Sequence, residues 1–79
     1  MKLIALNLPR DLTEDQLAKL FKKHGNIKSC DLVIDENTGK SKGFGFVEMA
    51  LEHEAIEAIK ELHGSKVNKN KIRVNKANK

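Results

Sequence analysis

Two aromatic side chains in one short run are the residues of this sequence best suited to binding a ligand. The segment KGFGFVEM, residues 42–49, contains Phe44 and Phe46, and the whole chain has only three aromatic residues. Lys42 opens the segment, and Lys40 lies two residues before it. Rings on which bases stack, with cations beside the phosphates, are typical of surfaces that bind single-stranded nucleic acid.

Residues for catalysis or metal binding do not form a comparable pattern. The segment TGKSKG resembles the end of a phosphate-binding loop, but Ile34 stands where that loop needs its first glycine, and the segment leads into an expected strand. The three histidines, His24, His53 and His63, have neither metal-ligand spacing nor a nucleophile beside them, and we interpret them as solvated surface groups. We therefore expect no enzyme activity, no catalytic residue, no metal site and no cofactor.

Charge is distributed unevenly along the 79 residues, whose net charge is +4. Residues 65–79 contain six cations and no acid, whereas residues 51–63 contain four glutamates and one lysine. Two interpretations stay open at this point. The chain has either a basic face for a polyanion with an acidic back, or a solvated surface that happens to be uneven.

Location is predicted from cysteine use and hydropathy. The single Cys30 cannot form an internal disulfide, which favours a reducing cytoplasm. The first ten residues have too short an apolar run for a signal peptide, and no apolar stretch approaches the roughly 20 residues of a membrane span. We expect a cytoplasmic protein with no membrane partner.

Apolar periodicity and turn residues predict the order strand, helix, strand, strand, helix, strand. Thr13 is a suitable N-cap with Gln16 as its capping-box partner, and Gly25 and Gly64 suit the ends of the two helices. The expected segments are 2–7, 12–25, 26–35, 43–49, 51–64 and 71–75. This order is an α+β, ferredoxin-like βαββαβ plan, in which right-handed crossovers place both helices on one face of a four-stranded antiparallel sheet.

Alternation within the strands predicts which side chains face away from the helices. Val47 and Met49 suit the core, which leaves Phe44 and Phe46 on the open face; the reverse arrangement would bury Glu48. The outer strands follow the same pattern, with Lys2, Ile4 and Leu6 open on the first strand and Lys71, Arg73 and Asn75 open on the last. A sheet face with rings and a cationic rim suits a single strand, while no helix carries a basic stripe for a DNA groove.

Over residues 2–77 the chain resembles the RNA recognition motif. KGFGFVEM matches seven of the eight positions of that family's octamer, K/R-G-F/Y-G/A-F-V-x-F/Y, and the hexamer is represented less well by LIALNL at residues 3–8. The short chain also resembles the stand-alone, single-motif members found in bacteria. This resemblance implies the sheet order 4-1-3-2 and one domain over residues 1–79, with its core at 2–77 and a short basic tail, 76–79, that frays.

The resemblance also implies roles for single residues. Phe46 is expected to stack one base, Phe44 to pack against sugars, and Lys42 to lie at a phosphate. Ile4 stands where the family usually has a second stacking ring, which predicts a weakened base site. Asn7 is expected to brace a turn. Lys69 replaces a frequent turn glycine, so that the left-handed residue moves to Asn68 or Asn70.

We therefore predict a protein that binds single-stranded RNA, and single-stranded DNA more weakly, as a monomer. The predicted RNA-binding residues are Phe44, Phe46, Lys42, Ile4, Lys2, Lys71, Arg73 and Asn75. The alternative is a protein-interaction module with weak or no RNA binding. In that case a partner would use the sheet or the helical face, where Ile56 lies at the edge of the apolar stripe.

Overall fold

A computed structural model describes residues 1–77, and the expected fraying of the tail lies partly outside them, at residues 78–79. Four strands form an antiparallel sheet in the order β2-β3-β1-β6, and two more strands form a small hairpin. The elements are β1 Lys2–Leu6, α1 Glu14–Lys22, β2 Ile27–Ile34, β3 Ser41–Met49, α2 Glu52–Leu62, β4 Lys66–Val67, β5 Asn70–Lys71 and β6 Arg73–Lys76. The predicted βαββαβ plan and sheet order are confirmed.

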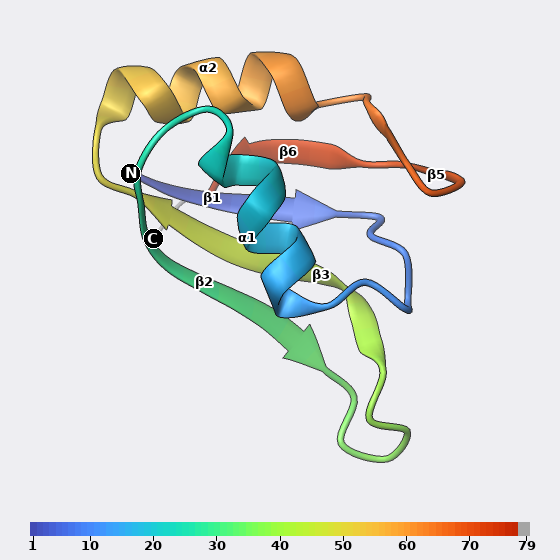
Figure 1. The fold of residues 1–79 in the computed structure, drawn as a ribbon. Coiled ribbons are helices and arrows are strands. Elements are labelled where there is room, and N and C mark those ends of the chain that lie inside the picture. The colour runs from blue at the N-terminus through green and yellow to red at the C-terminus, as the bar shows by residue number, and fades with distance from the viewer. Residues whose placement is uncertain (78–79) are drawn as a thin grey trace.

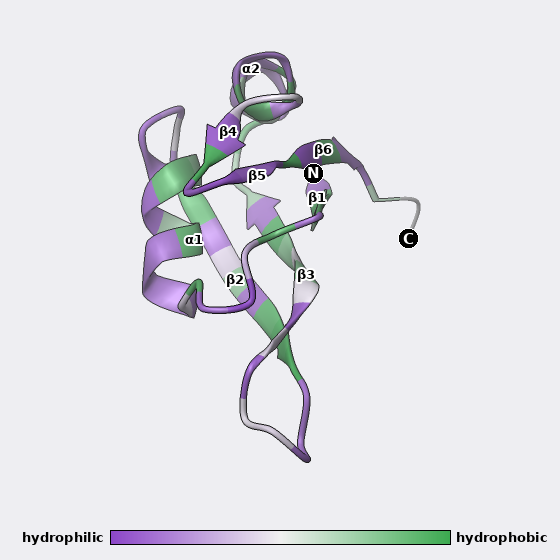
Figure 2. Ribbon diagram, turned by 90° about the vertical axis from the view of Figure 1, so that its right-hand side faces the viewer, coloured by the Kyte–Doolittle hydropathy of each residue, from purple (hydrophilic) through white to green (hydrophobic). Residues whose placement is uncertain are grey.

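Both helices cover one face of the sheet and leave the other face open (Figure 1). The core lies between the helices and the sheet, and apolar segments of the strands are visible beneath α1 and α2 in Figure 2. The largest fully buried side chains come from α1 and from the face of the sheet that the two helices cover. They are Phe21, Leu3, Leu17, Met49, Ile72, Val47 and Val74. The prediction that Val47 and Met49 face the core is therefore confirmed.

The predicted capping box begins α1. The Thr13 hydroxyl accepts a hydrogen bond from the N–H of Gln16, and the Gln16 side chain accepts one from the N–H of Thr13. The prediction for the other end is wrong, because α1 ends at Lys22 with Lys23 as its C-cap and Gly25 lies two residues further on. Gly64 does follow the C-cap of α2 directly, with a φ of 82°.

The last predicted strand is divided in two. The N–H of Ile72 donates to the carbonyl of Ser65, so the chain pairs first with β4, through β5, and only then with β1, through β6. A two-residue turn joins β4 to β5, and Asn68 adopts the left-handed conformation there, with a φ of 57°. This confirms the expectation that an asparagine beside Lys69 takes that role.

Gly45 leaves no room for a side chain between β3, β2 and α1. Unlike its neighbours Phe44 and Phe46, it faces the helices, and a Cβ added to it would lie 2.7 Å from the Asp31 carbonyl oxygen and 3.0 Å from the Leu17 side chain. No real side chain fits that space. The glycine of the octamer therefore allows α1 to pack directly on β3.

Candidate nucleic-acid interface

The register of the strands arranges the open face in rows that run across the sheet. Phe46 of β3 lies opposite Ile4 of β1 on one side and opposite Asp31 of β2 on the other. Ile4 in turn lies opposite Asn75 of β6. The resulting row, Asp31–Phe46–Ile4–Asn75, crosses all four strands.

A second row lies two residues along the strands. Phe44 is opposite Leu6 of β1, and Leu6 is opposite Arg73 of β6. The two rings therefore lie next to aliphatic side chains of β1 in both rows. The prediction that Ile4 lies beside the phenylalanines is confirmed.

The two rings contact each other edge to face. Their centroids are 6.3 Å apart and their planes are 87° apart, an arrangement preferred by aromatic pairs. Lys2 Nζ lies over the Phe46 ring, 5.2 Å from its centroid. Because of these contacts both rings are only partly exposed, although they do lie on the open face. A base that stacks on Phe46 from the side of Lys2 has to displace that ammonium group.

Three of the four predicted cations, Lys2, Lys42 and Arg73, lie on strands of the sheet that carries the rings. Lys42 is exposed near the start of β3, Lys71 is exposed on β5, and Arg73 is exposed on β6 in the row of Phe44. Lys2 on β1 completes the set beside the rings, whereas Lys71 lies outside the four-stranded sheet, on the β4–β5 hairpin, where its Cε is 3.8 Å from a Cβ placed on Gly64. Asn75, the last of the predicted residues, is exposed at the end of the Phe46 row.

Two acidic residues share this face, and sequence analysis assigned neither a role. Glu48 lies opposite Lys2 of β1 and opposite Ser29 of β2, while Asp31 lies opposite Phe46. The alternation of β2 around the inward-facing Leu32 could have placed Asp31 outside, but its neighbour depends on the pairing of β2 with β3. That register contains two irregularities, between Ile27 and Ser29 and between Leu32 and Ile34.

Asn7 braces the turn after β1, as predicted. It has a φ of 59°, and its Nδ2 donates to the Lys71 carbonyl at 2.8 Å. Asn70 Nδ2 donates back to the Asn7 carbonyl at 3.2 Å. These bonds hold the β4–β5 hairpin, and with it Lys71, against the end of β1.

His63 is exposed, but it is more than the solvated group expected from sequence. Its Nδ1 lies 3.2 Å from the N–H nitrogen and 3.1 Å from the carbonyl oxygen of Val74. The ring therefore covers part of the outer edge of β6, and its role is structural. Ile56, expected at the edge of the apolar stripe of α2, is 44% exposed.

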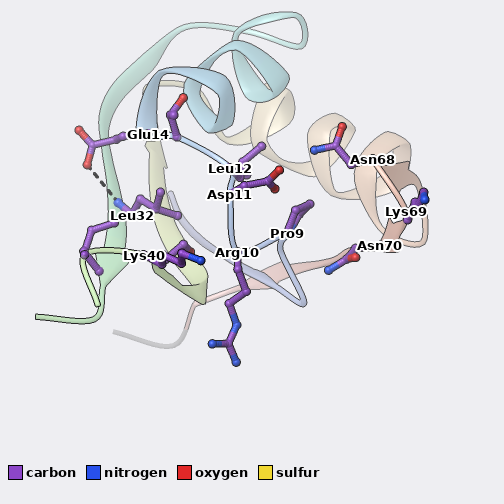
Figure 3. A pocket seen from close by; sticks show the side chains of 14 residues that line it. Pro9, Arg10, Asp11, Leu12, Glu14, Leu32, Lys40, Asn68, Lys69 and Asn70 are labelled. Atoms are coloured by element: carbon purple, nitrogen blue, oxygen red, sulfur yellow. Dashed lines mark hydrogen bonds between the residues drawn. The ribbon is translucent and has the colours of Figure 1, made fainter. Parts of the chain in front are cut away.

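Two pockets of the described structure are lined in part by the β4–β5 hairpin. The larger, of about 970 Å³, is formed by the β1–α1 loop, the end of β2, the β2–β3 turn and the β4–β5 hairpin (Figure 3). Within it the Glu14 carboxylate accepts a hydrogen bond from the Leu32 N–H at 3.1 Å. The smaller, of about 430 Å³, includes His63, Lys71 and Arg73.

The Cys30 thiol is held in its neutral form. Burial, followed by the carboxylates of Glu14, Asp31 and Asp15, raises the pKa of Cys30 to about 11. The thiolate is the reactive form of cysteine. Within residues 1–77 the structure has no group of three or more His, Cys, Asp or Glu side chains that could hold a metal ion. No helix in the same range is long and apolar enough to cross a membrane.

Comparison with known proteins places the chain in a family. The RNA recognition motif model matches residues 6–73, and the chain belongs to the RNA recognition motif family. The protein RbpB of Nostoc sp. is 39% identical over 77 residues, which are 98% of this chain and 75% of RbpB. This match confirms the resemblance to small, single-motif bacterial members of the family.

Longer proteins match as well. The 28 kDa chloroplast ribonucleoprotein of Spinacia oleracea is 44% identical over 71 residues, which cover 90% of this chain but only 30% of that protein. The chain thus spans less than a third of the length of this relative. The structure of a Sxl-lethal protein/RNA complex superposes with a TM-score of 0.93 and 36% identity, over 99% of this chain and 47% of the other.

Proposed function

We propose that the chain binds single-stranded RNA across its open sheet face, with Phe46 as the main stacking surface. The observation that carries this proposal is the row in which Phe46 lies between β1 and β2, with Phe44 edge to face beside it. Lys2, Lys42, Lys71 and Arg73 contact phosphates around the rings. Membership of the RNA recognition motif family and the similarity to an RNA-bound structure support the same function.

The residue roles belong to this proposal. Phe44 packs against a sugar, while Ile4 offers contact area but no ring to the next base. Asn75, at the end of the Phe46 row, has an exposed amide that can donate to and accept from a base. Single-stranded DNA binds more weakly because it lacks the 2′-hydroxyl.

We also propose the wider setting in which this surface acts. One domain over residues 1–79 acts as a monomer in the cytoplasm, without a cofactor or a catalytic step. Support for one domain comes from the match to RbpB over 98% of this chain and 75% of RbpB, and the single Cys30, which cannot form an internal disulfide, favours a reducing compartment. A protein partner, if one binds, has the 44% exposed Leu51 and Ile56 available beside α2.

NMR titration with short single-stranded RNA tests the proposed surface. We expect the largest amide shifts in β1, β3 and β6, while α1 and α2 respond little. Replacing Phe46 by alanine should weaken binding by about 1–3 kcal/mol, because one stacking surface is removed.

The matched control for this variant is Phe21→Ala. Phe21 is fully buried, so its loss should reduce the free energy of unfolding by about 3–5 kcal/mol, a much larger effect than that of Phe46→Ala on folding. Shifts centred on α2, or full RNA affinity in folded Phe46→Ala, would contradict the proposal.

A further inference from the structure

Asp31 stands next to the ring that is proposed to stack a base. It is the β2 partner of Phe46, and directly opposed residues of an antiparallel pair have Cβ atoms about 4.5–5.5 Å apart. Asp31 is exposed, whereas Cys30 and Leu32 on either side turn toward the core. Its carboxylate therefore lies on the open face, within reach of the edge of a base on Phe46.

A carboxylate at this place repels the phosphates of RNA, so Asp31 must have a role other than phosphate binding. Other acids near β2 have structural roles: Glu14 accepts from the Leu32 N–H, and Glu54 accepts from the Asn26 N–H, both at 3.1 Å. Asp31 lies on the opposite face of the sheet from the helices that carry those two residues. On that face its neighbours are Phe46 and the base that is proposed to stack on it.

The neighbours of Phe46 make Asp31 the nearest polar group in its row. On the β1 side the ring meets Ile4, and Asn75 comes only after it. On the β2 side it meets Asp31 directly. A base stacked on Phe46 therefore finds its nearest hydrogen-bond partner when its polar edge points toward β2. There it meets an ionised carboxylate, which only accepts hydrogen bonds.

The four bases differ in what they offer to such a group. In a single strand the Watson–Crick edges are free to be read. Guanine presents two adjacent N–H donors on that edge, which match the two oxygens of one carboxylate. Adenine and cytosine place one amino donor beside a ring acceptor, and uracil places one N–H between two carbonyl oxygens. Only guanine pairs with a carboxylate through two hydrogen bonds without an opposing acceptor.

We propose that Asp31 makes the Phe46 site selective for guanine, by accepting two hydrogen bonds from its Watson–Crick edge. This inference rests on the proposed function and adds a specificity to it. The stacking ring holds any base, since every base has a π-face, while the carboxylate distinguishes guanine from the other three.

Fluorescence anisotropy with short RNA oligonucleotides tests the inference. One oligonucleotide is all adenosine, and the others carry a single guanosine, cytidine or uridine near the centre. We expect the guanosine oligonucleotide to bind at least about fivefold more tightly than the other three, the lower end expected of a good bidentate pair. In Asp31→Asn this preference should disappear, because the amide presents a donor to one of the guanine N–H groups. Binding to the all-adenosine oligonucleotide should not weaken, since a negative charge is removed.

Glu48→Gln is the matched control, because it removes the same charge from the same face but from β3, two residues along the strand from Phe46, and not from the β2 position directly opposite the ring. It should keep the guanosine preference, and amide spectra of both variants establish that they fold. The inference is wrong if Asp31→Asn keeps the preference or raises affinity for all four oligonucleotides equally, as a merely solvated charge would. Absence of binding to every oligonucleotide by the unsubstituted protein would instead refute the proposed function.

Discussion

At the scale of single residues, Phe46 and its neighbours make different contributions to the proposed RNA-binding face. The ring supplies an apolar surface, Lys2 supplies a charge 5.2 Å from its centroid, and Ile4 extends the surface without a π-face. In the proposed binding mode, a base on Phe46 displaces Lys2 from the ring, and the ammonium group then contacts a phosphate. The same ammonium group can therefore shield the ring without RNA and contribute charge with it.

Restoring a ring at Ile4 should strengthen RNA binding. Ile4 lies directly opposite Phe46, so Ile4→Tyr places a second stacking surface beside the first. We expect binding to tighten by up to about 1–3 kcal/mol, measured by isothermal titration. The control is Ile56→Tyr on the exposed surface of α2, which should leave the RNA affinity unchanged. A folded Ile4→Tyr protein with unchanged affinity would mean that RNA does not cross this part of the sheet.

The neutral thiol of Cys30 should be slow to react. Its pKa of about 11 lies roughly two units above the ordinary value of 9.0, so near pH 8 the native protein contains about a hundredfold less thiolate than the unfolded chain. Alkylation by iodoacetamide should therefore be clearly slower in the native protein than in urea. Equal rates in both states would contradict the assignment.

The same shift predicts the sign of a pH effect on stability. The unfolded thiol loses its proton first as pH rises, so the contribution of Cys30 to stability is complete below pH 9 and is lost as pH rises through about 11. Cys30→Ser should reduce this alkaline loss. Urea unfolding curves at increasing pH measure it.

At the scale of elements, the octamer combines two functions on two faces of one strand. Phe44 and Phe46 face the open side, while Gly45 between them lets α1 approach β3. Gly45 belongs to the same octamer as the two proposed binding rings, but its own role is in packing. The alternation of β3 therefore couples the exposure of the rings to close packing on the other side.

Adding one methyl group at Gly45 should therefore destabilise the fold. Its Cβ would meet the Asp31 carbonyl oxygen at 2.7 Å, and backbone cannot move as easily as a side chain. We expect Gly45→Ala to reduce the free energy of unfolding by about 1–3 kcal/mol, measured by urea denaturation. An unchanged unfolding midpoint would show that β2 shifts away at no cost.

At the scale of the whole molecule, charge is uneven, although neither face carries a single sign. Lys2, Lys42 and Arg73 lie on strands of the open face together with Glu48 and Asp31, while α2 carries four glutamates and one lysine. RNA is attracted to the cations near the rings and repelled from α2. The proposed mode of binding depends on this attraction as well as on stacking.

Salt should weaken RNA binding by a predictable amount. Each phosphate contact contributes about −0.7 to the slope of log K against log salt concentration on single strands. Two to four contacts from Lys2, Lys42, Lys71 and Arg73 predict a slope between about −1.4 and −2.8. Replacing Lys71 by glutamine should reduce the slope by about 0.7, whereas Lys60→Gln on α2 should leave it unchanged. A slope near zero would contradict phosphate contacts altogether.

Local patterns in the sequence determined much of this molecule. The order of elements, the capping box at Thr13 and the inward and outward sides of β3 follow from periods of 3.6 and 2.0, which depend only on neighbours in the chain. The left-handed residue at Asn68 and the bracing role of Asn7 followed instead from the resemblance to the family, and both fit the tolerance of short amides for that backbone conformation.

Tertiary structure decided what local patterns do not specify, namely which residues from distant segments become neighbours. Asp31 meets Phe46, Lys2 covers that ring, and His63 contacts Val74 only through strand pairing and helix packing. The division of the last strand into β5 and β6 also depends on such contacts, because β5 pairs with β4 and β6 with β1. The register of a sheet pairs segments that are far apart in sequence. The two irregularities between β2 and β3 shift this pairing, and the sequence of either strand alone does not predict them.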